Sequence, residues 1–210
     1  MRHLFFDLDG TLTDPKLGIT RCIQHALAEL GEDVPHADTL TWCIGPPLKD
    51  SFATLVGAAR ADAAVALYRD RFAEIGLYEN ELYHGIREML RDLAVTEATL
   101  CVASSKPLIF VEQILEHFAL RDFFVDVFGS ELDGTRTDKG ELLAHALQAR
   151  AAQAEACVMI GDRKHDAIGA AKNGLDFVGV LYGYGDHAEL SGAGAVRFAE
   201  EPAALVSILR

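Results

Sequence analysis

The fold is decided by residues 3–12, which read HLFFDLDGTL. Residues 3–6 are a short apolar run of the kind that becomes a buried strand in a parallel sheet. Asp7 and Asp9 follow this run directly, and Gly10 lets the backbone turn tightly beside them. The stretch therefore predicts a buried strand whose carboxyl end carries two acidic side chains.

Later apolar runs predict four more strands, at residues 100–103, 125–128, 156–160 and 177–180. The segments between these runs have apolar residues at helical spacing. The clearest stripe consists of Ile86, Met89, Leu90 and Leu93. Alternation of strands and helices predicts an α/β fold with a doubly wound, Rossmann-like parallel sheet.

Residues 15–83 interrupt this alternation, because no strand pattern is found there. Apolar spacing instead predicts three helices, at about residues 19–30, 48–56 and 67–75. A structureless loop of that length would be unusual in a compact domain. We therefore expect an all-helical insertion at residues 15–83, and an α/β core formed by residues 1–14 and 84–210.

Composition limits the classes of partner. The chain has 210 residues, half of them hydrophobic, and its 19 basic and 32 acidic residues give a net charge of −13. Such a chain repels the phosphate backbone of nucleic acid and the surface of an anionic membrane, so neither is expected as a partner. To bind a phosphate ester, the protein needs a local cationic site made by a metal ion or by lysines.

Cysteine usage and hydropathy place the chain among soluble proteins. The four cysteines are far apart in sequence and lie in apolar stretches, so they are expected to be buried thiols, not disulfides. No segment approaches the ~20 apolar residues of a membrane span. Acidic residues come too early for a signal peptide. We expect a cytoplasmic protein that is a monomer or a weak homodimer.

Polar side chains follow three of the predicted strands. Asp7 and Asp9 follow the first, Ser104-Ser105-Lys106 follows the second, and residues 161–166, which read GDRKHD, follow the fourth. Ligands of open α/β sheets bind outside the carboxyl ends of the strands. The three strand ends together therefore predict a binding site.

The acidic residues at these strand ends suit a metal ion. Asp7 and Asp9 are two residues apart, so an extended backbone directs both side chains to the same side. Carboxylates held close together repel each other unless a cation lies between them or one is protonated. Asp162 completes an oxygen-rich set that suits Mg²⁺.

Two other positions have alternative explanations. Ser104 or Ser105 can donate a hydrogen bond to phosphate, or can cap a helix that starts at Pro107. Lys139 opens another predicted helix, where a lysine is ordinarily a solvated surface residue. The residues alone leave both alternatives open.

Taken together, these residues resemble the four motifs of the haloacid dehalogenase superfamily. Residues 7–12, which read DLDGTL, resemble the first motif; Ser104 resembles the second, Lys139 the third and residues 161–166 the fourth. The order and the spacing both agree with the superfamily pattern. The helical insertion directly after the first motif is similar to the C1-type cap domain of the superfamily.

The resemblance implies a role for each motif residue. Asp7 is the expected nucleophile that forms an aspartyl-phosphate, and Asp9 is the expected general acid and base. The phosphoryl oxygens are expected to be bound by Ser104, Ser105 and Lys139. The expected Mg²⁺ ligands are Asp7, Asp162 and the backbone carbonyl of Asp9. The expected supporting residues are Gly10, Thr11 and Asp166, which orients Lys139 or supports the metal ligands.

The closer resemblance is to phosphoglycolate phosphatases, in particular their nucleotidase-like branch. It is carried by residues 44–48 (IGPPL), 161–166 and 180–185 (VLYGYG), whereas Pro15 and Ser105 depart from the usual pattern. The expected function is Mg²⁺-dependent hydrolysis of a small phosphomonoester resembling phosphoglycolate. The alternatives are a 5'-nucleotidase, a sugar-phosphate mutase and a non-catalytic binding protein.

Two further observations concern the type of reaction and the binding of substrate. A dehalogenase releases halide and needs no acid at the position of Asp9, so this residue argues against dehalogenation. In the insertion, Lys16, Arg21 and Lys49 are candidates for contact with a substrate's carboxylate or nucleotide groups, although most such charges are simply solvated.

Overall fold

The computed structural model describes residues 2–210, which form two compact units. The core unit consists of Met1–Asp14 and Leu82–Arg210, and the helical unit consists of Pro15–Glu81. Two short strands, β2 (Thr13–Asp14) and β3 (Glu81–Leu82), pair where the chain leaves and re-enters the core unit. The expectation of no strand between residues 15 and 83 is therefore wrong at β3, because two residues are too few to show a strand pattern.

The core unit contains a six-stranded parallel sheet with the order β5-β4-β1-β6-β7-β8, which confirms the predicted α/β fold. Its strands are β1 (His3–Phe6), β4 (Thr99–Pro107), β5 (Asp126–Ser130), β6 (Cys157–Gly161), β7 (Asp176–Val180) and β8 (Phe198–Ala199). The last of these is again only two residues long and was not predicted. The first strand lies between β4 and β6, so the chain order reverses beside it.

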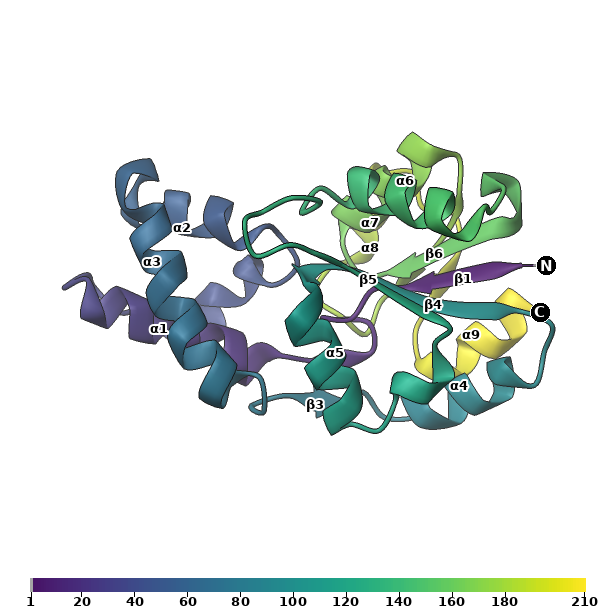
Figure 1. The fold of residues 1–210 in the computed structure, drawn as a ribbon, viewed down its shortest axis with the longest axis horizontal. Coiled ribbons are helices and arrows are strands. Elements are labelled where there is room, and N and C mark those ends of the chain that lie inside the picture. Colours follow the sequence, from purple (N-terminus) through teal and green to yellow (C-terminus); the bar gives the residue numbers. More distant parts are fainter. Residues whose placement is uncertain (1) are drawn as a thin grey trace. The chain divides into compact units, whose positions relative to one another are not determined.

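Helices cover both faces of this sheet. In Figure 1, α6 and α7 lie on one face, and α4, α5 and α9 lie on the other. The helices are α4 (Ile86–Ala94), α5 (Leu108–His117), α6 (Lys139–Arg150), α7 (Lys164–Asn173), α8 (His187–Gly192) and α9 (Pro202–Leu209), with short 3-10 turns at η3 (Arg121–Phe123) and η4 (Ala154–Ala156). A parallel sheet covered in this way is apolar on both faces, which is why the strands read as continuous apolar runs.

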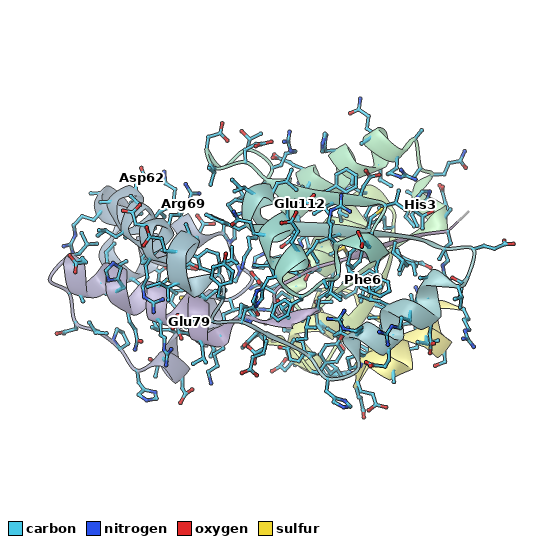
Figure 2. The ribbon with its side chains drawn as sticks, turned by 60° about the horizontal axis from the view of Figure 1, so that its bottom comes forward. His3, Phe6, Asp62, Arg69, Glu79 and Glu112 are labelled. Carbon is cyan, nitrogen blue, oxygen red and sulfur yellow. The ribbon has the colours of Figure 1, made fainter. Side chains whose placement is uncertain are left out.

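Burial of the first strand shows this directly. Adjacent side chains point to opposite faces, and both Phe5 and Phe6 are fully buried. Phe5 packs with Leu142 of α6 and Met159 of β6, whereas the ring of Phe6 lies 6.3 Å from that of Phe124. Phe6 is labelled in Figure 2. Burying one such side chain contributes about 1.5–3 kcal/mol, so the strand that precedes Asp7 is firmly anchored.

Local interactions fix the ends of two helices of the core unit. Asp138 accepts a hydrogen bond from the backbone N–H of Glu141 at the start of α6, and Gly174 ends α7 with φ of 74°. At α5 the expectation needs a correction. Pro107 is the last residue of β4 and the helix begins at Leu108, because the strand continues past its buried part.

The helical unit contains the three predicted helices and two shorter ones. They are α1 (Lys16–Glu29), η1 (Ala37–Cys43, a 3-10 helix), α2 (Leu48–Val56), α3 (Ala58–Arg71) and η2 (Phe72–Gly76, a π-helix). The third predicted helix begins earlier than expected, at Ala58, because its first half is rich in alanine and shows no stripe of large apolar residues. Figure 2 labels Glu79 of this unit. Its carboxylate accepts hydrogen bonds from Arg21 at 2.6 Å and from Arg71 at 2.8 Å.

Two expectations from composition can be checked here. All four cysteines are buried free thiols, as expected. Over residues 2–210, every helix is too short or too polar to cross a lipid bilayer.

Candidate active site

Three adjacent strands of the core unit place the site residues. Asp7 directly follows β1, Ser104 lies near the end of β4, and Asp162 directly follows β6. These strands are neighbours in the order β4-β1-β6, which is the reversal point where α/β sheets bind ligands. The site is therefore built on the most deeply buried strands of the sheet.

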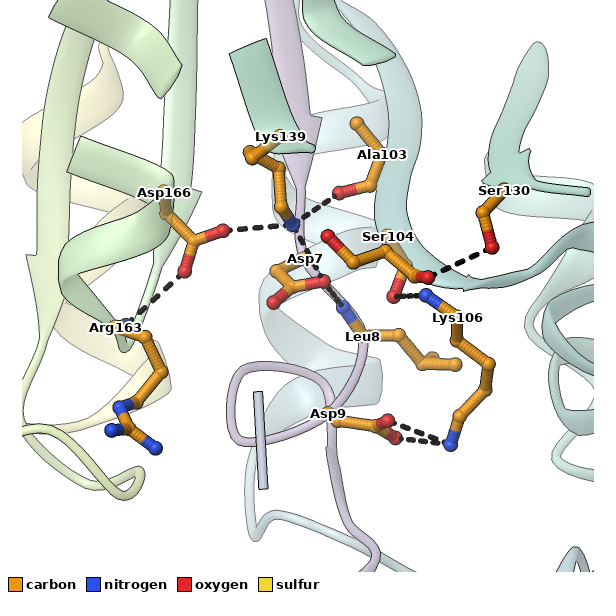
Figure 3. Close-up of polar contacts among 11 residues, drawn as sticks. Asp7, Leu8, Asp9, Ala103, Ser104, Lys106, Ser130, Lys139, Arg163 and Asp166 are labelled. Atoms are coloured by element: carbon orange, nitrogen blue, oxygen red, sulfur yellow. Dashed lines mark hydrogen bonds and ion pairs between the residues drawn. The ribbon is translucent and has the colours of Figure 1, made fainter. Parts of the chain in front are cut away.

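Lys139 lies at the centre of the site (Figure 3). Its Nζ atom is 2.9 Å from the carbonyl oxygen of Ala103, 3.1 Å from Asp7 Oδ1 and 2.8 Å from Asp166 Oδ1. The residue is 4% exposed, so the alternative of a solvated surface lysine is wrong. Burial alone lowers the pKa of Lys139, but the charges of Asp166 and Asp7 outweigh it and raise the pKa above the ordinary value. The amine therefore stays charged.

Asp7 is held by one of its two carboxylate oxygens. Oδ1 accepts a hydrogen bond from the backbone N–H of Leu8 at 2.8 Å and also faces Lys139 (Figure 3). Among residues 2–210, none donates a hydrogen bond to Oδ2. The protein thus fixes the carboxylate while leaving its second oxygen available for another partner.

Asp7, Asp162 and Asp166 form an acidic cluster, in which one oxygen of each lies within 4.8 Å of the others. Asp162 is fully buried, and its Oδ1 has no hydrogen-bond partner among the described residues. Burial and the charges of Asp166 and Asp7 raise the pKa of Asp162 well above its ordinary value. A divalent cation with oxygen ligands compensates both the repulsion and the unpaired oxygen, so this residue set fits Mg²⁺.

Asp9 belongs to a different pair. Both of its carboxylate oxygens contact Nζ of Lys106, at 2.8 and 2.6 Å (Figure 3). Burial raises the pKa of Asp9, although the charge of Lys106 partly offsets this rise. The side chain of Asp9 is thus outside the acidic cluster, and a metal contact through its backbone carbonyl is the only role that the resemblance gives it there.

No role in the site was predicted for Lys106 from the sequence. It follows Ser104-Ser105 at the end of β4, so its place beside two candidate residues was the available signal. Sequence alone does not show that its side chain reaches back to Asp9, which lies 97 residues away in the chain.

Ser104 and Ser105 make their hydrogen bonds at the end of β4 and not at the start of α5. Ser104 is 2% exposed, and its Oγ accepts a hydrogen bond from the backbone N–H of Lys106 at 3.4 Å. The carbonyl oxygen of Ser105 accepts a hydrogen bond from Ser130 Oγ at 2.9 Å. No side chain caps the start of α5, so the capping alternative for these serines is wrong.

The two supporting residues of the first motif are tightly packed. Gly10 has φ of 83°, and a Cβ atom there would lie 2.1 Å from Asp162 Oδ2. Thr11 is fully buried, and its carbonyl oxygen accepts a hydrogen bond from the hydroxyl of Tyr182 at 3.1 Å. Only glycine fits at position 10, because any side chain would displace Asp162.

The basic residues considered in the helical unit are all paired within that unit. Lys16 lies 2.6 Å from Asp38, Lys49 lies 2.7 Å from Asp62, and Arg21 contacts Glu79. These pairs leave the contact of the three residues with substrate untested.

The geometry can now be compared with known proteins. A family model described as haloacid dehalogenase-like hydrolase matches residues 4–180. The chain belongs to this family. All four motif positions lie within the matched residues.

Two relatives in this family are similar to this chain over most of its length. A 5'-nucleotidase of Pseudomonas aeruginosa is 48% identical over 209 residues, covering 99% of this chain and 95% of the relative. A phosphoglycolate phosphatase of Colwellia psychrerythraea is 28% identical over 191 residues, covering 86% of this chain and 84% of the relative. These findings support a phosphatase.

One relative carries a different name. The tyrosine-protein kinase PtkA of Mycobacterium tuberculosis is 40% identical over 182 residues, which are 87% of this chain. The match spans only 62% of PtkA, so that protein has additional sequence outside the shared part.

A solved structure has the same fold as this chain. The crystal structure of a predicted phosphatase from Clostridium acetobutylicum has a TM-score of 0.96 and 38% identity, and it covers 99% of this chain and 97% of the other.

Proposed function

We propose that this chain is a Mg²⁺-dependent phosphomonoester hydrolase that works through an aspartyl-phosphate on Asp7. The observation that carries the proposal is that the carboxylates of Asp7 and Asp162 each have an oxygen left for another partner. Asp7 is anchored through Oδ1 alone, and the buried Oδ1 of Asp162 has no hydrogen-bond partner among residues 2–210. One oxygen is available to attack, and the other is available to a cation.

The Mg²⁺ ion would be held by the carboxylates of Asp7 and Asp162, and by the backbone carbonyl of Asp9 as the family resemblance implies. Asp166 also belongs to the acidic cluster, but its 2.8 Å contact with Lys139 favours the role of orienting that amine. When bound, the ion neutralises the charge of the phosphate group, which lets an anionic ester approach an acidic site.

The side chains then divide the chemistry between them. Oδ2 of Asp7 attacks phosphorus, and the bond from phosphorus to the leaving oxygen breaks as Asp9 donates a proton to that oxygen. Asp9 next takes a proton from water, which attacks the aspartyl-phosphate and releases phosphate and the free carboxylate. Lys139, Ser104 and Ser105 bind the phosphoryl oxygens. Burial raises the pKa of Asp9 above its ordinary value, which is the direction that suits a group that must carry a proton in the first step.

The substrate class is a small phosphomonoester, and nucleoside monophosphates are the first candidates. The 5'-nucleotidase relative is 48% identical, whereas the phosphoglycolate phosphatase relative is 28% identical. By resemblance, the helical unit serves as the cap that selects the organic group. A sugar-phosphate mutase keeps the same two aspartates, so it is separated from a hydrolase by the fate of the phosphoryl group.

The test is phosphate release from p-nitrophenyl phosphate, with and without Mg²⁺, followed by a panel of nucleoside monophosphates, phosphoglycolate and hexose phosphates. We expect the Asp7→Asn variant to lose activity on the order of 10³-fold or more, because it lacks the nucleophile. Asp92→Asn changes an exposed aspartate of α4 and serves as the matched control. Parent-level turnover by Asp7→Asn would overturn the covalent route, and faster positional transfer than phosphate release would identify a mutase.

A further inference from the structure

The loop after β7 holds Asp162 from the side opposite its unpaired oxygen. The backbone N–H of Tyr184 donates a hydrogen bond to Asp162 Oδ2 at 2.7 Å, while Oδ1 has no partner among the described residues. This one hydrogen bond decides which carboxylate oxygen is left for the acidic cluster. The orientation of Asp162 therefore depends on where the peptide group of Tyr184 lies.

The residues on either side of Tyr184 bring that peptide group close. A Cβ atom on Gly183 would lie 2.3 Å from the carbonyl oxygen of Gly10 and 2.4 Å from Asp162 Cβ. A Cβ atom on Gly185 would lie 2.0 Å from the carbonyl oxygen of Asp162. Only glycine permits this approach at both positions, so the loop is packed directly against the metal-ligand candidate.

The side chain of Tyr184 anchors the same residue at its other end. Its hydroxyl donates a hydrogen bond to Asp14 Oδ1, at the end of β2. Tyr184 is thus held to Asp14 by its side chain and to Asp162 by its main chain.

We propose that Tyr184 is a positioning residue for the metal site: its hydroxyl, held by Asp14, fixes the peptide N–H that turns Asp162 Oδ1 toward the metal position. The inference rests on the proposed function, since it assigns the purpose of the orientation to Mg²⁺ binding. Loss of the hydroxyl leaves the acidic cluster intact but frees the loop. Mg²⁺ affinity should then fall, while the rate at saturating Mg²⁺ stays near that of the parent.

The test is the Mg²⁺ dissociation constant of the full chain, measured by titration calorimetry on Tyr184→Phe. We expect a rise of about tenfold, the size typical for residues that orient metal ligands. Tyr182→Phe is the matched control, because it removes a hydroxyl from the same loop whose hydrogen bond goes to Thr11 and not toward Asp162. Its dissociation constant should stay within about twofold of the parent. Equal affinity of parent and Tyr184→Phe would overturn the inference.

A second variant makes the test independent of how well Tyr184→Phe folds. Asp14→Ala removes the same tether from its other end, so its dissociation constant should rise equally, and the double variant should add little to either single change. Additive effects would show that the two residues act separately and would contradict the tether. If the parent itself does not bind Mg²⁺, the metal part of the proposed function fails, which is distinct from failure of the inference alone.

Discussion

Two groups of charged residues in this protein are balanced in opposite ways. In the helical unit, the single carboxylate of Glu79 is shared by Arg21 and Arg71. In the core unit, three carboxylates form the acidic cluster, and the amine of Lys139 contacts two of them, Asp7 and Asp166. The hydrogen bond from Arg71 lowers the pKa of Glu79, whereas burial raises that of Asp162. The first group is complete in the protein alone, and the second has an excess of negative charge that calls for a cation.

The largest effect is expected from removing the amine of Lys139, which contacts two carboxylates of the acidic cluster. Lys139→Met should lower phosphatase activity at least about 10²–10³-fold, because it removes the buried amine that we propose binds the phosphoryl oxygens. The metal-free protein should also lose about 3–5 kcal/mol of unfolding free energy, since buried carboxylates remain without a counter-charge. The measurements are steady-state phosphate release and urea unfolding.

Lys172→Met is the control for this prediction. Lys172 lies on α7, its side chain is 62% exposed, and it is 3.4 Å from Asp138. Its replacement should leave both activity and stability almost unchanged. Comparable losses in the two variants would mean that the site has no special need for the amine of Lys139.

The next prediction is that removing a negative charge changes stability in opposite directions in the two groups: it stabilises the acidic cluster and destabilises the pairs made by Glu79. Asp162→Asn should raise the metal-free stability by about 1–3 kcal/mol, because the amide removes a buried charge and its oxygen still accepts the N–H of Tyr184. Glu79→Gln should lower stability by a similar amount, because it weakens hydrogen bonds from two arginines. Thermal unfolding without metal measures both, at about 2–4 °C per kcal/mol. Destabilisation by both variants would contradict the interpretation that the acidic cluster carries an excess of negative charge in the metal-free protein.

The smallest effect is the pH dependence of stability. Burial raises the folded-state pKa values of Asp9, Asp162 and Asp166, so their contribution is fully present below the ordinary Asp pKa of about 4 and is lost as pH rises through the raised values. Glu79 has the opposite sign, and its contribution is lost as pH falls through its lowered pKa.

We therefore expect the metal-free protein to lose stability as the pH rises above about 4. Saturating Mg²⁺ should remove most of this loss, because the ion compensates the charged carboxylates. The measurement is the unfolding free energy across this pH range, with Mg²⁺ and with a chelator. Identical pH curves under the two conditions would show that the metal does not interact with these carboxylates.

The sequence was a good guide wherever a pattern was long enough. The apolar run at residues 3–6 is β1 itself, and the apolar stripe from Ile86 to Leu93 lies in α4. The short strands β3 and β8 have two residues each and therefore carry no periodic signal. Alanine-rich sequence likewise hid the start of α3, because alanine marks no face of a helix strongly.

Individual side-chain partners were harder to predict than strand ends. Strand order places Asp7, Ser104 and Asp162 at one edge of the sheet once a parallel α/β fold is assumed. The pairing of Lys106 with Asp9 depends on how a flexible side chain crosses between two strand ends, which no local pattern records. The link from Tyr184 to Asp162 is equally hidden, because it is made by a backbone N–H that every residue except proline possesses.

The central position of β1 has a consequence for how the protein is made. This strand is synthesised well before its two neighbours, which begin only at Thr99 and Cys157. Because these parallel pairings join distant parts of the chain, we expect them to form late and slowly. The surroundings of Asp7 are therefore incomplete until β6 has been synthesised. A nascent chain stopped before Cys157 should expose an apolar strand edge that chaperones can bind.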